Sequence, residues 1–92
     1  MNLTKVSIIT VVYNNVEYIK NAIQSVLSQD YLNIEYIVID GNSNDGTISA
    51  IKEFEDQIDY FFSSSDKGIY DALNKGIEIS TGEIIGILHS DD

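Results

Sequence analysis

Residues 6–12 read Val6-Ser7-Ile8-Ile9-Thr10-Val11-Val12, an apolar and β-branched run that leads to Asn14-Asn15. A continuous run of this kind is typical of a strand whose two faces are both buried in a sheet. Apolar residues spaced as one face of a helix follow, from Tyr18 to Leu27. We predict that Asn14 caps this helix, with Glu17 completing a pair that resembles a capping box.

The same alternation of strand and helix continues along the chain. Further strands are predicted at residues 36–39, 59–62 and 84–88. A helix entered through Asp45-Gly46-Thr47 is predicted between the first two of these strands, and another begins near Lys67 and buries Ile77. The order βαβαβαβ with continuous apolar strands indicates the α/β class, with a parallel four-stranded sheet covered by helices on both faces. We expect residues 1–92 to form a single domain.

The composition excludes several classes of function. The formal net charge is −10, with fifteen acidic residues, five lysines and no arginine. Such a chain repels polyphosphate backbones, so we expect no nucleic-acid partner. The chain has no cysteine, which excludes disulfides and thiolate chemistry. No apolar stretch reaches the roughly 20 residues of a membrane span, and the first residues lack the layout of a signal peptide. A cytoplasmic location is the expectation.

The carboxyl ends of parallel strands meet at one edge of the sheet, where α/β proteins bind their ligands. Four carboxylates are predicted to lie at this edge: Asp40, Asp45, Asp91 and Asp92. Clustered carboxylates repel one another, and their oxygens suit a hard divalent cation such as Mg²⁺ or Mn²⁺. Simpler interpretations stay open, because Asp45 can serve only as a helix cap and Asp40-Gly41 only as a turn.

Four segments carry a more specific signal than the edge as a whole. They are residues 6–14, residues 39–47, residues 66–76, and residues 81–83 with the terminal Ser90-Asp91-Asp92. In this order and spacing they resemble the nucleotide-sugar glycosyltransferases of family 2, and in particular bacterial enzymes that build surface or capsular polysaccharides. The resemblance covers the whole chain. It implies a Rossmann-like three-layer αβα arrangement, the N-terminal half of a GT-A fold.

The resemblance also implies a role for particular positions of this chain. Val11, Val12 and Tyr13, followed by Asn14, would line the nucleotide base and ribose. Asp40, Gly41 and Ser43 would lie beside the base, and Asp66 and Lys67 would lie near the nucleotide-sugar. Asp92 would hold Mn²⁺ or Mg²⁺, and Asp91 would contact ribose, sugar or metal-bound water. Relatives often have a second acidic residue where this chain has Gly41, so the preferred base stays open.

These roles describe the donor half of an inverting glycosyltransferase. The domain would bind a nucleoside-diphosphate sugar through the metal, for transfer to a saccharide or lipid-linked acceptor. In the resembled family the catalytic base lies in the later half, so we expect a longer protein, no catalytic residue within residues 1–92, and no activity from this part alone. The longer enzyme would in some cases associate with a membrane, and the sheet edge left open here would favour self-association.

Two other functions are compatible with the same layers of helix and strand. One is a non-catalytic nucleotide- or metal-binding α/β module. The other is a receiver domain like that of response regulators, which also collects aspartates at the edge of a parallel sheet. A receiver domain needs a phosphate-accepting aspartate after its third strand, where this chain has Ser63-Ser64-Ser65. The sequence therefore favours the glycosyltransferase interpretation.

Overall fold

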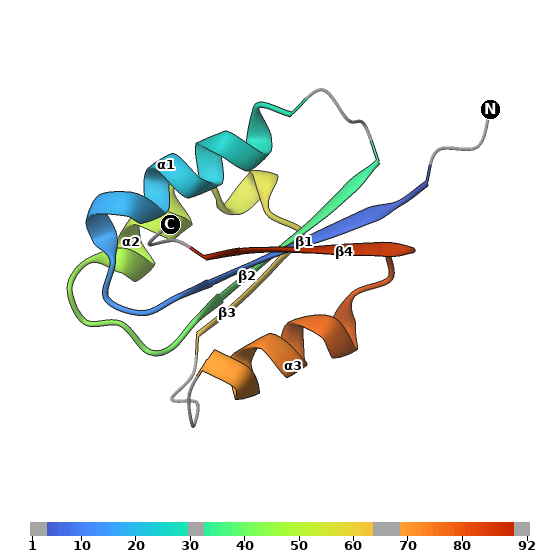
Figure 1. Ribbon diagram of the computed structural model, residues 1–92. Helices are drawn as coiled ribbons and strands as arrows, with labels where there is room; N and C mark the ends of the chain where they lie inside the picture. Colours follow the sequence, from blue (N-terminus) through green and yellow to red (C-terminus); the bar gives the residue numbers. More distant parts are fainter. Residues whose placement is uncertain (1–3, 30–32, 64–68, 90–92) are drawn as a thin grey trace.

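The computed structural model describes residues 4–29, 33–63 and 69–89 (Figure 1). Strands and helices alternate along the chain. They are β1 (Val6–Val12), α1 (Val16–Leu27), β2 (Ile34–Asp40), α2 (Thr47–Lys52), the 3-10 helix η1 (Glu55–Gln57), β3 (Tyr60–Ser63), α3 (Ile69–Ile79) and β4 (Ile84–His89). All four strands are parallel, in the order β3-β2-β1-β4. The predicted α/β class and parallel four-stranded sheet are confirmed.

The register of the sheet decides which residues meet at the carboxyl edge. Val12 of β1 is paired with Asp40 of β2, and Asp40 is paired in turn with Ser63 of β3. On the other side of β1, Val11 is paired with the backbone of His89 in β4. Helices α1 and α2 lie on one face of the sheet and α3 lies on the other (Figure 1). The polar residues that follow β1 and β2 therefore begin side by side.

The core has one cluster on each face of the two central strands. The cluster beneath α1 and α2 includes Ile19, Ile23, Tyr36, Val38 and Ile51, whereas the cluster on the α3 side is Ile9, Val11, Ile37 and Ile39. Helix α3 approaches this second cluster closely, because a Cβ atom at Gly76 would lie only 2.8 Å from Cγ2 of Ile9. Inside the first cluster the Tyr36 and Thr10 hydroxyls are hydrogen-bonded at 2.8 Å. Burial raises the pKa of Tyr36 to about 12, so the phenol stays neutral.

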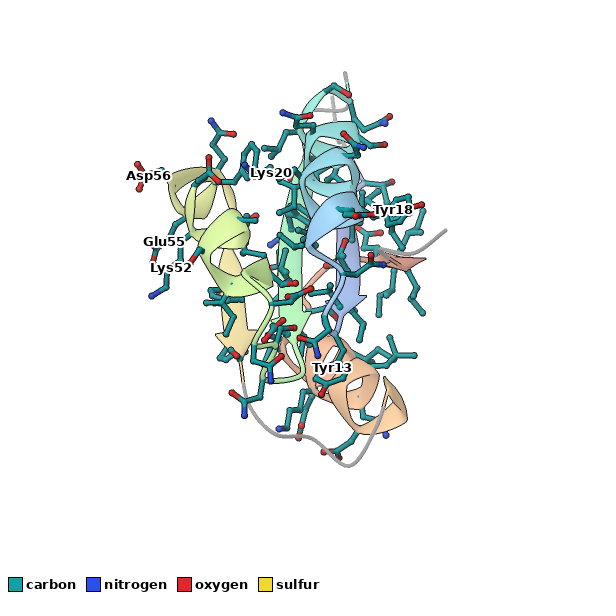
Figure 2. The ribbon with its side chains drawn as sticks, turned by 90° about the vertical axis from the view of Figure 1, so that its left-hand side faces the viewer. Tyr13, Tyr18, Lys20, Lys52, Glu55 and Asp56 are labelled. Atoms are coloured by element: carbon teal, nitrogen blue, oxygen red, sulfur yellow. The ribbon has the colours of Figure 1, made fainter. Side chains whose placement is uncertain are left out.

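The prediction that the sheet is covered on both faces holds for β1 and β2 and is wrong for the edge strands. Ile84, Ile85 and Ile87 of β4 are exposed, because β4 lies at the edge and only β1 pairs with it among the described residues. The predicted buried faces of the helices were also too wide. Tyr18 is 51% exposed and Ile77 is 41% exposed, and Figure 2 shows Tyr18 projecting sideways from α1. Each lies at the margin of its helix's apolar face.

No helix in the described part of the chain is long and apolar enough to cross a membrane.

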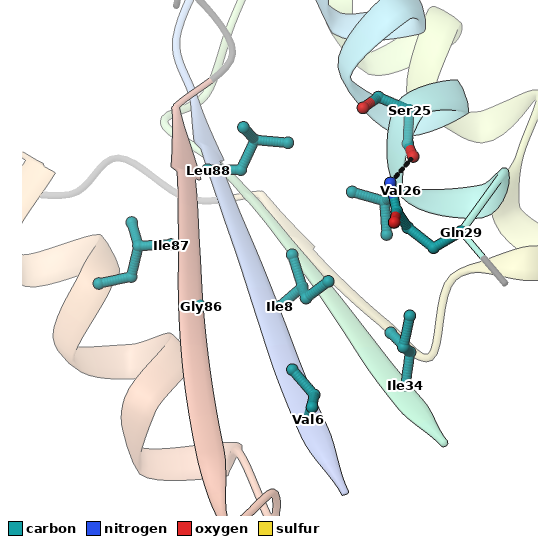
Figure 3. Close-up of a pocket in the computed structure, with 9 residues that line it drawn as sticks. All are labelled: Val6, Ile8, Ser25, Val26, Gln29, Ile34, Gly86, Ile87 and Leu88. Atoms are coloured by element: carbon teal, nitrogen blue, oxygen red, sulfur yellow. Dashed lines mark hydrogen bonds between the residues drawn. The ribbon is translucent and has the colours of Figure 1, made fainter. Parts of the chain in front are cut away.

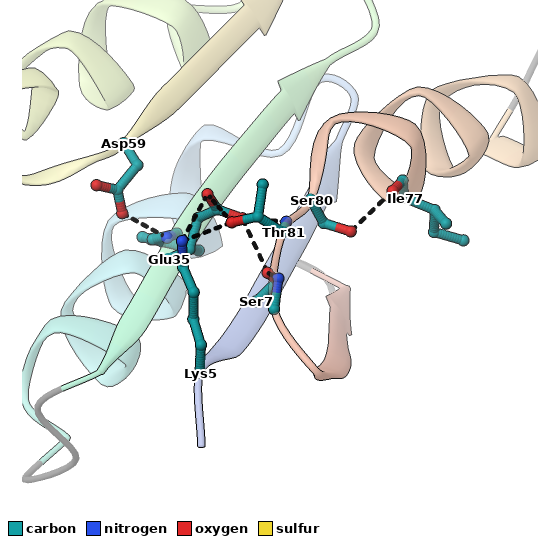
Figure 4. A network of polar contacts seen from close by, with 9 residues as sticks. Lys5, Ser7, Glu35, Asp59, Ile77, Ser80 and Thr81 are labelled. Carbon is teal, nitrogen blue, oxygen red and sulfur yellow. Dashed lines mark hydrogen bonds and ion pairs between the residues drawn. The ribbon is translucent and has the colours of Figure 1, made fainter. Parts of the chain in front are cut away.

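At the opposite, amino edge of the sheet the structure buries a carboxylate that the sequence pattern did not reveal. Glu35 accepts hydrogen bonds from the Ser7 hydroxyl at 2.9 Å and from the backbone amide and hydroxyl of Thr81 at 2.9 and 3.0 Å (Figure 4). The ammonium group of Lys5 lies 3.5 Å from Oε2 of Glu35. The Ser7 hydroxyl also accepts the amide of Gly82 at 2.8 Å. This network joins the turn between α3 and β4 to strands β1 and β2 by hydrogen bonds.

The Glu35 network predicts a pH-dependent stability. Burial alone would raise the pKa of Glu35, but the hydrogen bonds from Thr81 and Ser7 and the charge of Lys5 lower the pKa below its ordinary value. A lowered pKa means that the stabilisation is present above the ordinary pKa and is lost as the pH falls through the folded-state pKa. We expect Glu35→Gln to lower the free energy of unfolding by about 2 kcal/mol at pH 7, with a smaller deficit at pH 3.

Urea unfolding at the two pH values measures both effects. Glu53→Gln is the matched control, because Glu53 is paired with Lys20 at an exposed position and should have little influence on stability. A Glu35→Gln deficit that is the same at pH 7 and pH 3 would contradict the role given to the ionised carboxylate.

Candidate functional site

Asp40 lies at the carboxyl end of β2 and organises the loop that follows this strand. Its side chain is 0% exposed. Oδ2 accepts the backbone amide of Ser43 at 2.8 Å and the hydroxyl of Ser63 at 2.9 Å, and Oδ1 accepts the hydroxyl of Ser43 at 2.5 Å. The end of β2, its own loop and the end of β3 are therefore joined through one buried carboxylate.

The loop after β2 is bonded in turn to the loop after β1. The Ser43 hydroxyl accepts the backbone amide of Asn14 at 2.7 Å, and the side-chain oxygen of Asn14 accepts the amide of Asn44 at 2.8 Å. Asn14 and Asn42 have positive φ angles of 45° and 68°, a left-handed conformation that asparagine tolerates better than most residues. The two loops thus form one cross-linked surface.

Asp45 joins the same two loops from the solvent side. One of its oxygens accepts the amide of Val16, the first residue of α1, at 3.2 Å. The other accepts the amide of Thr47 at 3.0 Å and also the hydroxyl of Thr47. The hydrogen bond from the Thr47 hydroxyl is the largest cause that lowers the pKa of Asp45. Asp45 therefore stabilises the first turns of both α1 and α2.

The prediction that Asn14 caps α1 was wrong. The residue at the N-cap position is Asn15, and its side chain makes no capping hydrogen bond. The amide of Asn15 instead donates to the Thr47 hydroxyl at 3.1 Å, and the capping acceptor for Val16 comes from Asp45. The capping group is thus supplied by a loop about 30 residues further along the chain, which a local capping motif does not reveal.

An exposed aromatic ring lies beside this cross-linked surface. Tyr13 directly follows β1, is 64% exposed, and projects from the carboxyl end of the sheet (Figure 2). A Cβ atom at Gly41 would lie 3.3 Å from Cδ1 of Tyr13, so the ring lies closely over the backbone of Gly41. The Val11 and Val12 side chains are buried in the core clusters. These valines therefore offer a ligand only their backbone.

Asp40 and Asp45 are the carboxylates of the predicted cluster that the structure describes, and hydrogen bonds account for the position of both. Their oxygens accept hydrogen bonds from the neighbouring loops. In residues 4–29, 33–63 and 69–89 no group of three or more histidine, aspartate or glutamate side chains is arranged to hold a metal ion. Four predicted site residues, Asp66, Lys67, Asp91 and Asp92, lie outside the described residues.

Comparisons with known proteins agree on one family. The family model of glycosyl transferase family 2 matches residues 7–92. An uncharacterized glycosyltransferase of Mycobacterium tuberculosis is 39% identical over 88 residues, which are 95% of this chain and 34% of the relative. TuaG of Bacillus subtilis, a glycosyltransferase named for teichuronic acid biosynthesis, is 34% identical over 95% of this chain and 36% of its own length. The chain thus covers about a third of the length of each of these two relatives.

The solved structures identify the same fold. The mannosyltransferase PcManGT of Pyrobaculum calidifontis, solved in complex with GDP-Man and Mn²⁺, superposes with a TM-score of 0.85 and 28% identity over 96% of this chain and 28% of its own. The parallel sheet, its two helical layers and the polar loops at its carboxyl edge are those of a Rossmann-like domain, the N-terminal part of a GT-A glycosyltransferase. The chain belongs to glycosyl transferase family 2.

Proposed function

We propose that this chain is the donor-binding part of a metal-dependent glycosyltransferase, and that the carboxyl edge of its sheet binds a nucleoside-diphosphate sugar. The chain belongs to a glycosyltransferase family, and one observation on its structure supports the proposal. The loops after β1 and β2 are held together by their own side chains and present the exposed Tyr13 ring over a glycine. The complex of PcManGT with GDP-Man and Mn²⁺ supports this choice of ligand.

Each predicted residue has a role in this proposal. Tyr13 offers an aromatic face to a base, and the backbone of Val11 and Val12 lines the floor below it. The segment Asp40 to Ser43, with Asn14, forms the wall of the site. Asp66 and Lys67 lie near the nucleotide-sugar, Asp91 contacts ribose, sugar or metal-bound water, and Asp92 would hold Mn²⁺ or Mg²⁺. The bound metal would stabilise the charge that develops on the nucleoside-diphosphate leaving group.

The remaining steps of the reaction belong to the longer protein. Because the chain covers only about a third of the length of relatives such as TuaG, we assign the catalytic base and the acceptor site to the part outside residues 1–92. Transfer with inversion to a saccharide or lipid-linked acceptor, in polysaccharide biosynthesis, is the activity we propose for that protein. Its location would be cytoplasmic, with membrane contact where the acceptor is a lipid. Residues 1–92 alone would bind the donor and transfer nothing.

Calorimetric titration tests the donor-binding part of the proposal. UDP, GDP, TDP and CMP are each added to the chain with Mn²⁺, and again with EDTA. We expect one nucleoside diphosphate to bind in the presence of Mn²⁺ and its binding to be lost with EDTA. Binding of a nucleotide that EDTA does not affect would favour the non-catalytic module, and no binding by any of the four would contradict a donor site in this chain.

The open edge of the sheet supports a second proposal, which is self-association. Strand β4 presents exposed isoleucines and has no charged residue between Ile84 and Leu88, although the chain as a whole has a net charge of −10. Beside β4, on the α1 face of the sheet, lies an apolar hollow of about 380 Å³ (Figure 3). Its lining includes Ile8, Val26, Ile34 and Leu88. An uncharged edge strand with apolar surface is the kind of edge that pairs with another copy.

We expect sedimentation at high protein concentration to show a dimer, and Ile87→Lys to shift the chain to monomer. Ile77→Lys is the matched control, because Ile77 is comparably exposed but lies on α3 rather than on the sheet edge. A wild-type chain that sediments only as a monomer would count against pairing through β4.

A further inference from the structure

The carboxylate of Asp40 makes its hydrogen bonds inside the protein. Its oxygens accept three hydrogen bonds, two from Ser43 and one from Ser63. Because the side chain is 0% exposed, a nucleotide or metal ion at the surface does not reach it while the loop is in place. Any influence of Asp40 on a ligand therefore passes through the residues that it holds.

Ser43 carries this influence to the neighbouring loop. A serine hydroxyl has a single proton, and here that proton is donated to Oδ1 of Asp40. The lone pairs of the hydroxyl are then free to accept the backbone amide of Asn14 at 2.7 Å. The Asp40 carboxylate thus fixes the direction of the Ser43 hydroxyl, and the hydroxyl fixes the backbone of Asn14.

The loop segments held in this way have conformations that need support. Asn14 and Asn42 both have positive φ angles, which cost energy for any residue with a Cβ atom. The Gly41 amide donates a hydrogen bond to the Val12 carbonyl at 2.9 Å, which joins the ends of β1 and β2 just before these positions. Beyond it, Asn14 is joined to Ser43 and Asn44 through side-chain bonds.

We propose that Asp40 is a positioning residue of the donor site, which acts through Ser43 on Asn14 and touches neither the nucleotide nor the metal. This inference rests on the proposed function, and it deepens the role given there to the segment Asp40 to Ser43. It predicts that Asp40 contributes to the affinity for every nucleoside diphosphate alike, because it shapes the loop and does not read the base.

The test compares Asp40→Asn, Ser43→Ala and the double variant with the wild-type chain. Asp59→Asn is the matched control, because Asp59 also accepts a backbone amide, that of Tyr36 at 2.7 Å, but at the opposite edge of the sheet. Two quantities are measured for each variant. One is the affinity for UDP and for GDP with Mn²⁺, and the other is the hydrogen exchange of the Asn14 and Asn44 amides without nucleotide.

We expect Asp40→Asn and Ser43→Ala each to lower the affinity about tenfold for whichever nucleotides bind, and by the same factor for each. The double variant should lose little more than either single variant, because the two residues act in one chain of bonds. The Asn14 and Asn44 amides should exchange faster in all three variants, while the amide of Ile37 in the sheet core keeps its protection. Asp59→Asn should change none of these quantities.

Three results would overturn the inference. A loss of affinity in Asp40→Asn with unchanged exchange at Asn14 and Asn44 would indicate direct contact with the nucleotide. A loss confined to one base would indicate the same. No change in either quantity would show that Asp40 positions nothing. If the wild-type chain binds no nucleotide, the proposed function fails, and the exchange data alone then decide whether Asp40 holds the loop.

Discussion

Replacing Gly82 by alanine is expected to lower the free energy of unfolding by about 3 kcal/mol, a large fraction of the stability of a domain this size. A Cβ atom at this position would lie 2.5 Å from the Ser7 hydroxyl, 2.6 Å from the Ser7 amide nitrogen and 3.0 Å from the Lys5 carbonyl. Two of these three atoms belong to the backbone beside β1 and cannot rotate away. The φ angle of Gly82 is not positive, so the backbone conformation does not require glycine here. Glycine is required because there is no room for a Cβ atom.

The damage would extend beyond the clash itself. Moving residue 82 away from β1 breaks the hydrogen bond from its amide to the Ser7 hydroxyl and weakens the one from the Glu83 amide to the Lys5 carbonyl, which is 2.8 Å long. These bonds begin the pairing of β4 with β1. Denaturant unfolding followed by circular dichroism measures the loss.

Gly86→Ala is the matched control for this prediction. Gly86 lies within β4, shortly after the turn that holds Gly82, but a Cβ atom there would meet only Cγ1 of Ile8, at an ordinary contact distance of 3.9 Å. We expect this variant to stay within about 1 kcal/mol of the wild-type chain. Equal unfolding midpoints for Gly82→Ala and Gly86→Ala would contradict the close approach at Gly82.

The largest expected effect on function is that of Asp92→Ala. If Asp92 holds the metal ion of the donor site, removing its carboxylate should weaken metal-dependent nucleotide binding by at least about a hundredfold. The chain has no arginine to take over the neutralisation of the phosphates. The unfolding midpoint should not change, because both core clusters of the sheet are built from other residues. Titration of the preferred nucleoside diphosphate with Mn²⁺ measures the effect.

Asp56→Ala removes the same charge elsewhere and serves as the control. Asp56 is an exposed residue of η1, at the end of the molecule opposite to Tyr13 (Figure 2). It should leave the affinity unchanged. If Asp92→Ala binds nucleotide and Mn²⁺ as tightly as the wild-type chain does, Asp92 is not a ligand of the metal.

Much of the architecture could be predicted from local sequence. The run from Val6 to Val12 and the apolar residues at 36–39 and 84–88 indicated buried parallel strands, and the structure has strands there. These patterns are local, because strand and helix periodicity depend on residues close to one another in the chain. The same patterns could not show that β4 lies at an edge, since Ile84 and Ile87 look like core residues when read alone.

The location of the candidate site at the carboxyl edge of the sheet was also predictable, whereas the hydrogen bonds that its side chains make were not. Parallel strands bring their carboxyl ends together, so Asn14, Asp40 and Asp45 could be placed at one edge from their positions after strands. Sequence reasoning gave the cap of α1 to Asn14, and it did not reveal the hydrogen bonds that Asp40 accepts. The structure buries Asp40 beneath Ser43 and assigns the cap to Asp45.

The sequence by itself determined the order in which strands and helices follow one another along the chain, their parallel arrangement and the family to which the chain belongs. Only the tertiary structure decided which polar groups meet. Glu35 bonds Thr81 across 46 residues, Gly82 bonds Ser7 across 75, and Ser43 bonds Asn14 across 29. The physical reason is that such partners are chosen by strand order and register, which form only when the whole sheet assembles.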